Sequence, residues 1–502
     1  MSERIRTYSV CQWNDRSTCR RPEEPCLNTH TPECVDLLRR ARLAFGAGRT
    51  LTESFRLAQM EAVVLMLEEH ECEWVEALGK DLHKPRFETV LCEVTPVKNE
   101  AVHAMNNLKK WMQPQPVERN LSTTLDECRV VHEPVGVVFI RGSWCSPVQM
   151  CLVPLLGAIA AGNCAILSPS EWAAHTAELL HRLVPFYLDN ECFHVILEGV
   201  NDLPEVFELK FDHIFFAGSR EDGGKVAESA AHTLTPVTLI IGGKNPCYVD
   251  RECDIGTTAQ RLVWARFHNA GQSLVAPGYV LCHAQVKARL VQAMKSCLIH
   301  FYGSDPRESK SFGRLINLEV FNRVKDLLWR SGKVAVGGQV VEAEKYIAPT
   351  ILTEVTESDL IMHQEVFGPV LPILTVNDVD EAITFINKQE KALCVYAYST
   401  NTKIISRLMS ETSSGSFCSN DSILQSLMVT LPFGGVGASG MGSFHGRYSF
   451  DAFSHRKSCL LRSARLECVT YLRYPPYEDH NLSLIAWAST HSQRSRGWCQ
   501  IM

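Results

Sequence analysis

One short segment of small residues has the composition of a phosphate-binding turn. Residues 218–223 read GSREDG and directly follow a run of β-forming residues. Small residues at a strand-to-helix turn let the backbone amides at the helix start approach a phosphate. Because a turn of this kind more often only connects its strand to its helix, it is weak evidence for a nucleotide site by itself.

The last four residues carry a signal for a different chemistry, the attachment of a lipid. Cys499-Gln500-Ile501-Met502 fits the C-a-a-X pattern for prenylation of Cys499, and a terminal methionine favours farnesyl over geranylgeranyl. A single lipid chain needs a second, weaker membrane contact. The candidates for that contact are Trp487, Arg494, Arg496 and Trp498. We therefore expect peripheral attachment to a membrane surface, with an unmodified tail as the alternative.

The cysteines give no sign of a metal site. The chain has 20 of them, scattered along its length without a C-x-x-C pair. The four nearest the N-terminus are Cys11, Cys19, Cys26 and Cys34, and their spacing fits no zinc-site pattern. A cytosolic chain of this size does not need disulfides, so we expect most of these thiols to be buried and predict no metal.

The overall composition is that of an ordinary globular protein. With 502 residues, 45% hydrophobic and 21% charged, the chain is expected to form two or three domains with real cores. A net charge of −6 disfavours nucleic acid as a partner. Residues 1–21 lack the apolar run of a secretory signal, and the longest apolar run, 150–161, is too short to span a bilayer. We expect a cytoplasmic protein.

Alternating patterns in the first half predict a doubly wound parallel sheet. A helical layer comes first, at residues 31–112. The β-rich runs that follow are residues 135–140, 164–167, 194–197 and 213–216, and the helical segments between them are residues 148–160, 171–185 and 202–208. Right-handed crossovers would stack these strands in parallel, and a nucleotide is the default ligand of such a sheet.

A second alternation begins after Pro236 and predicts a second α/β domain. Its expected elements are a strand at residues 237–241, helices near 257–269 and 284–301, and a strand at 370–376. Toward the C-terminus, the glycine-rich run at residues 431–446 is predicted to form a closely packed loop instead of regular helix or strand.

Ten short runs form the most specific pattern in the chain. They are EPVG at 133–136, GAIAAGN at 157–163, PSE at 169–171, FDH at 211–213, LTPVT at 234–238, GGKNP at 242–246, NAGQ at 269–272, YIAPT at 346–350, EVFGP at 365–369, and the glycine-rich run ending at Gly446. In this order they resemble the aldehyde dehydrogenase superfamily, most closely its class 3 branch, over about residues 35–476. The resemblance implies an α/β fold with a Rossmann-type doubly wound cofactor domain, an α/β catalytic domain, a small oligomerisation segment and a homodimer.

For chemistry, the resemblance implies NAD(P)-dependent oxidation of a small aldehyde to a carboxylic acid through a covalent thioester. A cysteine thiolate attacks the carbonyl, hydride leaves to the nicotinamide, and a glutamate activates the hydrolytic water. An asparagine amide and a backbone amide hold the oxyanion. The cofactor-binding residues that the resemblance assigns are Glu171, Gly218, Ser219, Gly223, Glu365 and Phe367.

The sequence departs from this pattern at the reacting centre. The nucleophile's position in the run GQSLVAP holds Leu274, and the base's position in LIIGGK holds Ile240. Their spacing, 274 − 240 = 34, is that of the family. The oxyanion-binding amide in the run WCSP is replaced by Cys145, a weaker donor. Ser168 stands where the family places a lysine near the cofactor's ribose.

These departures predict a catalytically degenerate protein that acts by binding. Loss of an oxyanion donor costs roughly 100-fold to 1,000-fold, whereas loss of the nucleophile costs about a million-fold. Two alternatives stay open: an active dehydrogenase with Cys145 as a relocated nucleophile, and a non-catalytic scaffold or dimer partner whose cleft binds nothing. A gene-model error would need independent changes at all of these positions.

The domain scheme that follows has five parts. They are a loose N-terminal extension at residues 1–30, an NAD(P)-binding domain at 31–236 with an oligomerisation hairpin near 113–132, a catalytic domain at 237–425, an oligomerisation and C-terminal packing segment at 426–470, and a tail with the C-a-a-X motif at 471–502.

Overall fold

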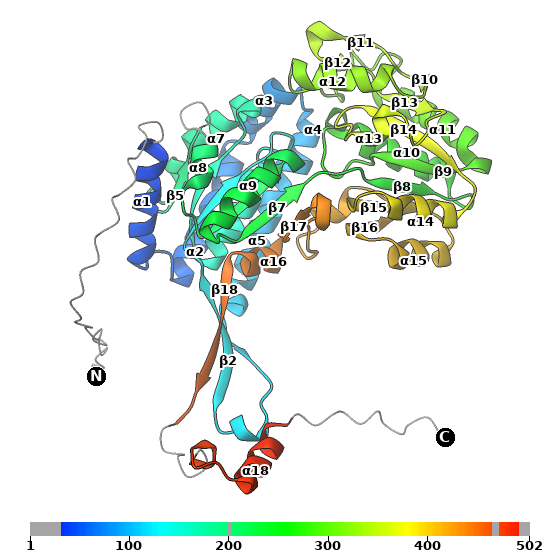
Figure 1. The fold of residues 1–502 in the computed structure, drawn as a ribbon. Helices are drawn as coiled ribbons and strands as arrows, with labels where there is room; N and C mark the ends of the chain where they lie inside the picture. The colour runs from blue at the N-terminus through cyan, green and yellow to red at the C-terminus, as the bar shows by residue number, and fades with distance from the viewer. Residues whose placement is uncertain (1–31, 198–202, 464–470, 491–502) are drawn as a thin grey trace, which may run out of the picture.

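The computed structural model describes residues 32–197, 203–463 and 471–490. Two lobes with helices packed over their sheets lie side by side, and a narrow arm extends away from them (Figure 1). The expected extension at residues 1–30, three of its cysteines and the C-a-a-X motif lie outside the described residues.

The first lobe contains the doubly wound sheet that the sequence predicts. Its strand order is β17-β7-β6-β3-β4-β5, and β7, β6, β3, β4 and β5 are mutually parallel. The strands are β3 (Val137–Arg141), β4 (Cys164–Ser168), β5 (Phe193–Val195), β6 (His213–Gly218), β7 (Val237–Ile241) and β17 (Gly440–Met441). The helices of this lobe are α6 (Gln149–Ala161), α7 (Ala174–Tyr187), α8 (Leu203–Glu208) and α9 (Arg220–Thr233). The predicted fold class is therefore confirmed.

The strand at Val237–Ile241 was expected to open the second alternation, but it belongs to the first sheet. Its residues pair in parallel with β6, from Ile214 opposite Val237 to Gly218 opposite Ile241. Beyond it, β17 adds an antiparallel edge of two residues from within the glycine-rich run. Sequence patterns alone could not assign this strand, because an apolar run of five residues fits either of two neighbouring sheets.

The second lobe is built on a seven-stranded sheet with the order β10-β13-β14-β9-β8-β15-β16. Its strands are β8 (Pro246–Val249), β9 (Tyr279–His283), β10 (Lys333–Val336), β13 (Thr350–Thr353), β14 (Val370–Val376), β15 (Ala392–Tyr398) and β16 (Ser414–Ser419). Its helices are α10 (Ile255–Phe267), α11 (Ala284–Tyr302), α12 (Leu318–Trp329), α13 (Leu360–His363), α14 (Val379–Lys388) and α15 (Thr402–Glu411). The small ladder of β11 (Val340–Val341) with β12 (Tyr346–Ile347) lies beside them.

The arm is a three-stranded antiparallel sheet, β1-β2-β18. Its strands are β1 (Gln115–Pro116), β2 (Glu127–Pro134) and β18 (Ser454–Leu461). β1 and β2 form the expected hairpin, and β18 pairs with the whole length of β2. Helix α16 (Gly446–Ala452) leads into β18, and α18 (Asp479–Ser489) packs near the 3-10 turn η2 (Leu121–Thr123) at the far end of the arm (Figure 1).

The N-terminal helices complete the first lobe, and some of their residues lie toward the second lobe. They are α1 (Pro32–Gly46), α2 (Glu53–Glu69), α3 (Glu71–Leu82), α4 (Arg86–Thr89), the π-helical turn η1 (Val90–Val94) and α5 (Thr95–Trp111). A π-helical turn is frequent at functional sites, and η1 faces the cavity described below. Within the three described ranges, no helix is both long and apolar enough to cross a bilayer.

A buried histidine in β6 predicts that the fold loses stability in acid. His213 is 4% exposed, and its Nε2 lies 2.9 Å from the Thr238 hydroxyl. Burial lowers the pKa of His213 to about 4, whereas an unfolded histidine titrates near 6.5. Below a pH of about 6.5, this histidine takes up a proton in the unfolded chain but stays neutral in the folded chain until the pH reaches about 4. Stability should therefore fall by up to roughly 3 kcal/mol as the pH drops from about 6.5 to about 4.

Urea unfolding at several pH values checks this expectation. The free energy of unfolding of His213→Gln should depend less on pH than that of the parent over this pH range, because glutamine has no proton to take up. His480→Gln, at an exposed residue of α18, is the matched control and should keep the parent's slope. Equal slopes for the parent and His213→Gln would contradict the assignment.

Candidate active site

A small cavity lies where η1, the loop after β3 and the loop before β9 meet. It is lined by Cys92, Cys145, Ser146, Gln149, Met150, His268, Ser273, Leu274, Val275, Ile423, Ser426, Leu427, Phe433 and Phe444. Its volume is about 40 Å³, which is room for roughly three water molecules. The structure therefore brings Cys145 and Leu274, two of the four altered positions, into one site.

The backbone around Leu274 is tightly constrained. Asn269, Ala270 and Gly271 all have positive φ values, of 50°, 53° and 73°, and this conformation costs an alanine roughly 1–2 kcal/mol. A Cβ on Gly271 would lie 2.3 Å from the Gly368 carbonyl oxygen, so only glycine fits there. The Asn245 amide donates to the carbonyl oxygen of Leu274 at 2.8 Å. The loop thus holds Leu274 in one place at the cavity wall.

Ile240 lies in a different environment from Leu274. It is fully buried in β7, and its backbone is paired with Gly440 of β17. Ile240 is not among the residues that line the cavity. A position of this kind supplies packing to the first sheet and no proton acceptor.

Cys145 lies in the cavity wall as a deeply buried thiol. It is 1% exposed, and its sulfur lies 3.3 Å from the Ser143 hydroxyl. Burial raises the pKa of Cys145 to about 11, although the contact with Ser143 opposes that rise. A thiol with such a pKa is protonated at neutral pH and is a poor nucleophile.

Two residues that the sequence did not single out line the same cavity. Cys92 and His268 both line it, and His268 Nδ1 lies 3.4 Å from Glu88 Oε2. The buried Lys84 donates to Glu93 beside them. Lys84, Glu88 and Cys92 recur every four residues, the spacing of one helix face, although Lys84 lies in the loop before α4, Glu88 on α4 and Cys92 on η1. That spacing was the available signal, but nothing local connects these residues with His268.

The turn after β6 is closed by its own side chains. Ser219 caps α9: its hydroxyl accepts from the Asp222 backbone N–H at 3.1 Å and donates to the Asp222 carboxylate at 2.6 Å. A Cβ on Gly223 would lie 2.7 Å from the Ile241 side chain, and one on Gly218 would lie 2.7 Å from the Phe216 ring. A side chain at either position would therefore have to displace the Ile241 or Phe216 side chain.

Glu365 and Phe367 follow α13 and approach the turn after β7. The Glu365 carboxylate accepts from the Gly243 backbone N–H at 3.1 Å, and burial raises the pKa of Glu365. Phe367 has a φ of 43°, and its ring packs edge-on against Trp144 with ring centres 5.2 Å apart. Arg323 fixes this segment, because it donates to the carbonyl oxygens of Glu365 and Val366 at 2.6 Å and 3.0 Å.

The edge where β4, β3 and β6 end does not fit a pyrophosphate. Glu171 opens the 3-10 turn η3 (Glu171–Ala173) near the end of β4, while Glu221 and Asp222 form the first turn of α9. The cations on α9 near this edge are engaged, because Arg220 pairs with Glu390 and Lys225 pairs with both of these α9 carboxylates. Negative side chains at this edge repel an anionic ligand, and the Ser219 hydroxyl already accepts from the Asp222 N–H at the helix start.

The changed residue Ser168 adds to this misfit. It ends β4 fully buried, and its hydroxyl has no hydrogen-bond partner among the described residues. A serine supplies no positive charge at the place where the family resemblance expects a lysine. The described residues contain no group of three or more His, Cys, Asp or Glu side chains arranged to hold a metal ion.

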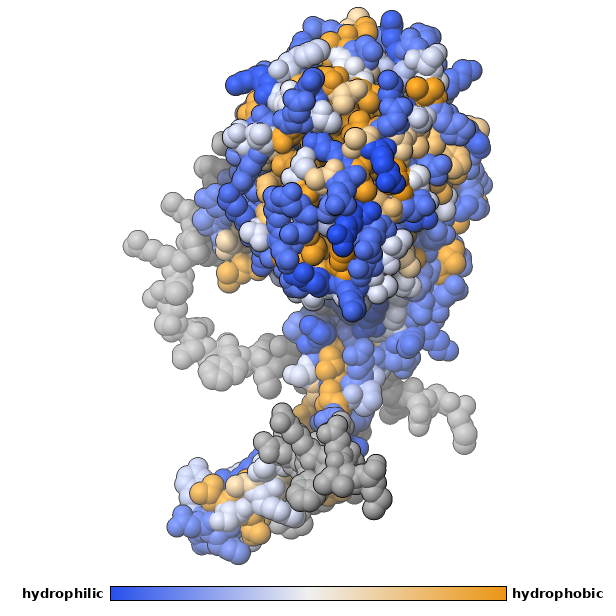
Figure 2. All heavy atoms as spheres, turned by 90° about the vertical axis from the view of Figure 1, so that its right-hand side faces the viewer, coloured by the Kyte–Doolittle hydropathy of each residue, from blue (hydrophilic) through white to orange (hydrophobic). Residues whose placement is uncertain are grey.

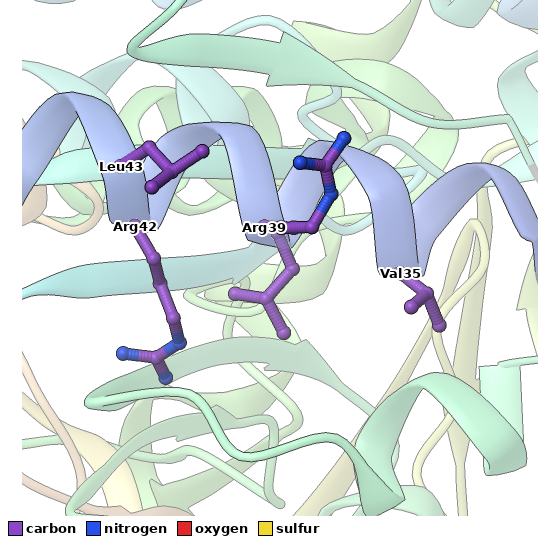
Figure 3. Close-up of a pocket in the computed structure, with 5 residues that line it drawn as sticks. Val35, Arg39, Arg42 and Leu43 are labelled. Atoms are coloured by element: carbon purple, nitrogen blue, oxygen red, sulfur yellow. The ribbon is translucent and has the colours of Figure 1, made fainter.

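A second hollow, on the surface of α1, offers no comparable chemistry. It is lined by Val35, Leu38, Arg39, Arg42 and Leu43, which all come from one helix (Figure 3). Both arginines are engaged: Arg39 pairs with Asp36 at 2.7 Å, and Arg42 pairs with Asp212 at 3.0 Å. The cavity at Leu274 is therefore the candidate active site.

Comparison with known proteins agrees with the motif pattern. Residues 28–459 match the sequence profile of the "Aldehyde dehydrogenase family". The chain is 47% identical to human "Aldehyde dehydrogenase family 3 member B1" over 450 residues, which are 90% of this chain and 96% of that protein. It is 45% identical to "Aldehyde dehydrogenase family 3 member A2" of Pongo abelii, over 88% of this chain and 90% of that protein.

Solved structures show the same fold. AldH of Staphylococcus aureus, solved in a substrate-bound state, superposes with a TM-score of 0.87 at 37% identity, over 90% of this chain and 99% of that one. An NAD-dependent aldehyde dehydrogenase from Sinorhizobium meliloti has a TM-score of 0.78 at 26% identity, over 86% and 89% of the two chains. The motifs, the fold and these identities together show that the chain belongs to the aldehyde dehydrogenase family.

Proposed function

We propose that this chain is a catalytically degenerate aldehyde dehydrogenase family member that acts by binding instead of turnover. The observation that carries this proposal is Leu274, held by the strained loop at the cavity wall and 7% exposed. An aliphatic side chain cannot form the thioester through which the family oxidises aldehydes. Formation of NADH or NADPH by the purified protein with a panel of aldehydes is the test.

The other altered positions support the same conclusion. Ile240 is buried against β17 and has no group that could activate water. Cys145 is a buried thiol with a high pKa in place of an amide donor. Because a nucleophile, a base and an oxyanion donor act as a unit, their losses are not additive, but the missing nucleophile alone suffices to stop covalent catalysis.

Two alternatives lead to different results. A relocated nucleophile at Cys145 would give an active enzyme, and the burial that raises the pKa of this thiol to about 11 argues against it. A pure scaffold or dimer partner would bind neither cofactor nor aldehyde. Titration with cofactor separates the two, because the degenerate protein should still bind cofactor weakly, whereas the scaffold should not bind it at all.

Weak binding of NAD⁺ and NADP⁺ is the expected result of that titration. The carboxylates of Glu221 and Asp222 at the start of α9 repel the pyrophosphate of either cofactor. Asp222→Asn should tighten binding by about fivefold, which corresponds to about 1 kcal/mol for one exposed charge. Isothermal titration calorimetry at two salt concentrations measures both affinities. Added salt should reduce the difference in cofactor affinity between the parent and Asp222→Asn.

A matched control lies on the same helix. Glu228→Gln removes an exposed carboxylate from α9 away from its first turn and should leave the affinity unchanged. Tight cofactor binding by the parent, or equal affinities for the parent and Asp222→Asn, would refute the claim that Asp222 repels the cofactor.

The arm supports a homodimer. Apolar side chains follow the narrow arm and gather at its lower end (Figure 2). The exposed members on the strands and turns of the arm are Val117, Leu121, Leu125, Leu460 and Leu461. Exposed apolar side chains gathered on one small element favour an interaction site there. We propose that residues 113–132 and 426–470 serve oligomerisation, as the domain scheme predicts, and that residues 31–236 and 237–425 are the cofactor and catalytic domains.

We also propose that the tail attaches the protein to a cytoplasmic membrane surface through a farnesyl group on Cys499. α18, at the end of the arm, supports this because it exposes Leu482 and Trp487. Trp is favoured at membrane interfaces, where its ring is apolar and its N–H is hydrated.

A further inference from the structure

Two buried cysteines lie side by side at the start of neighbouring strands in the first sheet. Cys164 begins β4, and Cys192 directly precedes β5. These strands are parallel, with Ala165 opposite Phe193, and the Ala165 backbone N–H donates to the Cys192 carbonyl oxygen at 3.0 Å. One residue earlier on each strand, Cys164 therefore lies opposite Cys192. Side chains at opposite positions of neighbouring parallel strands point to the same face of the sheet, so the two thiols are neighbours.

The two thiols contact each other and are closed to solvent. Both residues are 0% exposed. The hydrogen bond between the thiols, together with burial, raises the pKa of Cys164 far above its usual range. Neighbouring strands lie about 4.8 Å apart, within the Cα–Cα separation of roughly 4.4–6.8 Å that a disulfide spans. A bond between the two sulfurs therefore requires rotation of two side chains and no change in the sheet.

The turn that carries Cys192 is held in place by the N-terminal part of the chain. Its Asp189 accepts from the Cys192 backbone N–H at 3.0 Å through the carbonyl oxygen and pairs with Arg49 at 2.6 Å through the carboxylate. Arg40 of α1 pairs with Glu191 at 2.9 Å, and α1 packs against β4 (Figure 1). Asp189 and Arg49 act on the Cys164 thiol in opposite directions, so the site is built by position and not by a charge that activates sulfur.

We propose that Cys164 and Cys192 form an oxidation site, at which a hydroperoxide converts the two thiols into a disulfide. Cys192 meets the oxidant first, because it directly follows the exposed Asn190 and Glu191. Its sulfur attacks one peroxide oxygen, the O–O bond breaks, and the other oxygen leaves as water or an alcohol. The Cys164 sulfur then attacks the resulting sulfenic acid, forms the S–S bond and releases water. The two thiols lose two electrons and the peroxide gains them, so no cofactor is needed.

This oxidation site does not depend on the function proposed above. Cys164 lies at the amino end of β4, whereas Ser168 and the edge expected to bind the cofactor lie at its carboxyl end. The bond would close a chain loop that contains α7, because the cysteines are 192 − 164 = 28 positions apart. A cross-link of this kind stabilises a protein mainly by constraining the unfolded chain. The oxidised protein should therefore unfold at a higher urea concentration than the reduced protein.

Peptide mapping of the intact protein tests the proposal. The reduced full-length chain is treated with hydrogen peroxide, the remaining thiols are alkylated in denaturant, and chymotryptic peptides are analysed without reduction. Treatment lasts about tenfold longer than the exposed Cys72 needs to react, because buried thiols react more slowly. Most chains should then carry a link between Cys164 and Cys192, and dithiothreitol should remove it.

Variants assign the link to this pair. Cys164→Ser should abolish the link, leave a sulfenic acid on Cys192 that dimedone traps, and remove the rise in the urea midpoint after oxidation. Cys151→Ser, at another fully buried cysteine of the first lobe, is the matched control. It should leave both the link and the rise in the urea midpoint unchanged.

Two outcomes would overturn the proposal: a parent without the link at the end of the treatment, or a link that forms only when the protein is first unfolded in urea. Both are measured on the parent, so misfolding of a variant cannot obscure them. Failure of the proposed function gives a different signal, because an active dehydrogenase forms NADH or NADPH whether or not the link is present.

Discussion

The purified protein is expected to oxidise aldehydes about a million-fold more slowly than a relative with a cysteine at the position of Leu274. The reason is chemical, because hydride leaves only from the tetrahedral adduct that a nucleophile forms with the carbonyl. The leucine occupies the cavity wall where that adduct would form. The measurement is NADH or NADPH absorbance with saturating cofactor and a series of aldehydes of increasing length.

Restoring the nucleophile can be tested without the cofactor. Hydrolysis of an activated acetyl ester needs a nucleophile but no hydride acceptor. Leu274→Cys should therefore release a burst of the leaving alcohol, whereas Leu274→Ser, the matched control, should not. Both variants are made in a Cys92→Ser background, so that the second thiol of the cavity cannot contribute.

Restoring dehydrogenase activity requires more than the sulfur. Leu274→Cys with Ile240→Glu supplies the nucleophile and the base, but the glutamate would replace a fully buried isoleucine, and burying its carboxylate costs several kcal/mol unless it finds a partner. Circular dichroism must therefore show that the double variant folds. Addition of Cys145→Asn should raise the rate of a folded double variant by roughly 100-fold to 1,000-fold. Parent rates typical of the family would refute the degenerate assignment.

Helices and strands could be predicted closely where the hydrophobic periodicity agreed with the residues that begin and end an element. The segment predicted at residues 284–301 is α11 (Ala284–Tyr302), and the run predicted at 370–376 is β14 (Val370–Val376). Sheet membership was harder, as the strand after Pro236 shows, because pairing partners are chosen by tertiary packing. The glycine-rich run also contains the short strand β17, which pairs through backbone groups that no side-chain pattern reports.

The candidate site could likewise be predicted only in part. Motif order predicted that Cys145 and Leu274 share a site, and both line one cavity. Cys92 and His268 lie far apart in the sequence and in no shared motif, so only their shared place in the cavity wall reveals them. For Gly218 and Gly223, space around each Cβ identified a packing role that the residue type alone left open.

Membrane binding should depend almost wholly on Cys499. A farnesyl chain buries apolar carbons at about 0.8 kcal/mol each, so Cys499→Ser is expected to lower partitioning onto anionic vesicles by about 1,000-fold or more. Trp487, exposed on α18, supplies a weaker contact, and Trp487→Ala should cost about tenfold. The protein is first prenylated in a cell extract. Its co-sedimentation with vesicles then measures the effects of both substitutions.

The lipid itself can be identified by the same variants. Labelled farnesyl should enter the parent and Cys72→Ser, a control at an exposed cysteine, but not Cys499→Ser. Met502→Leu should exchange the farnesyl label for geranylgeranyl while vesicle binding persists. A label that survives Cys499→Ser would refute the assignment. Because α18 ends at Ser489, only a short segment separates it from Cys499, so a lipid there would bring the apolar end of the arm to the membrane surface.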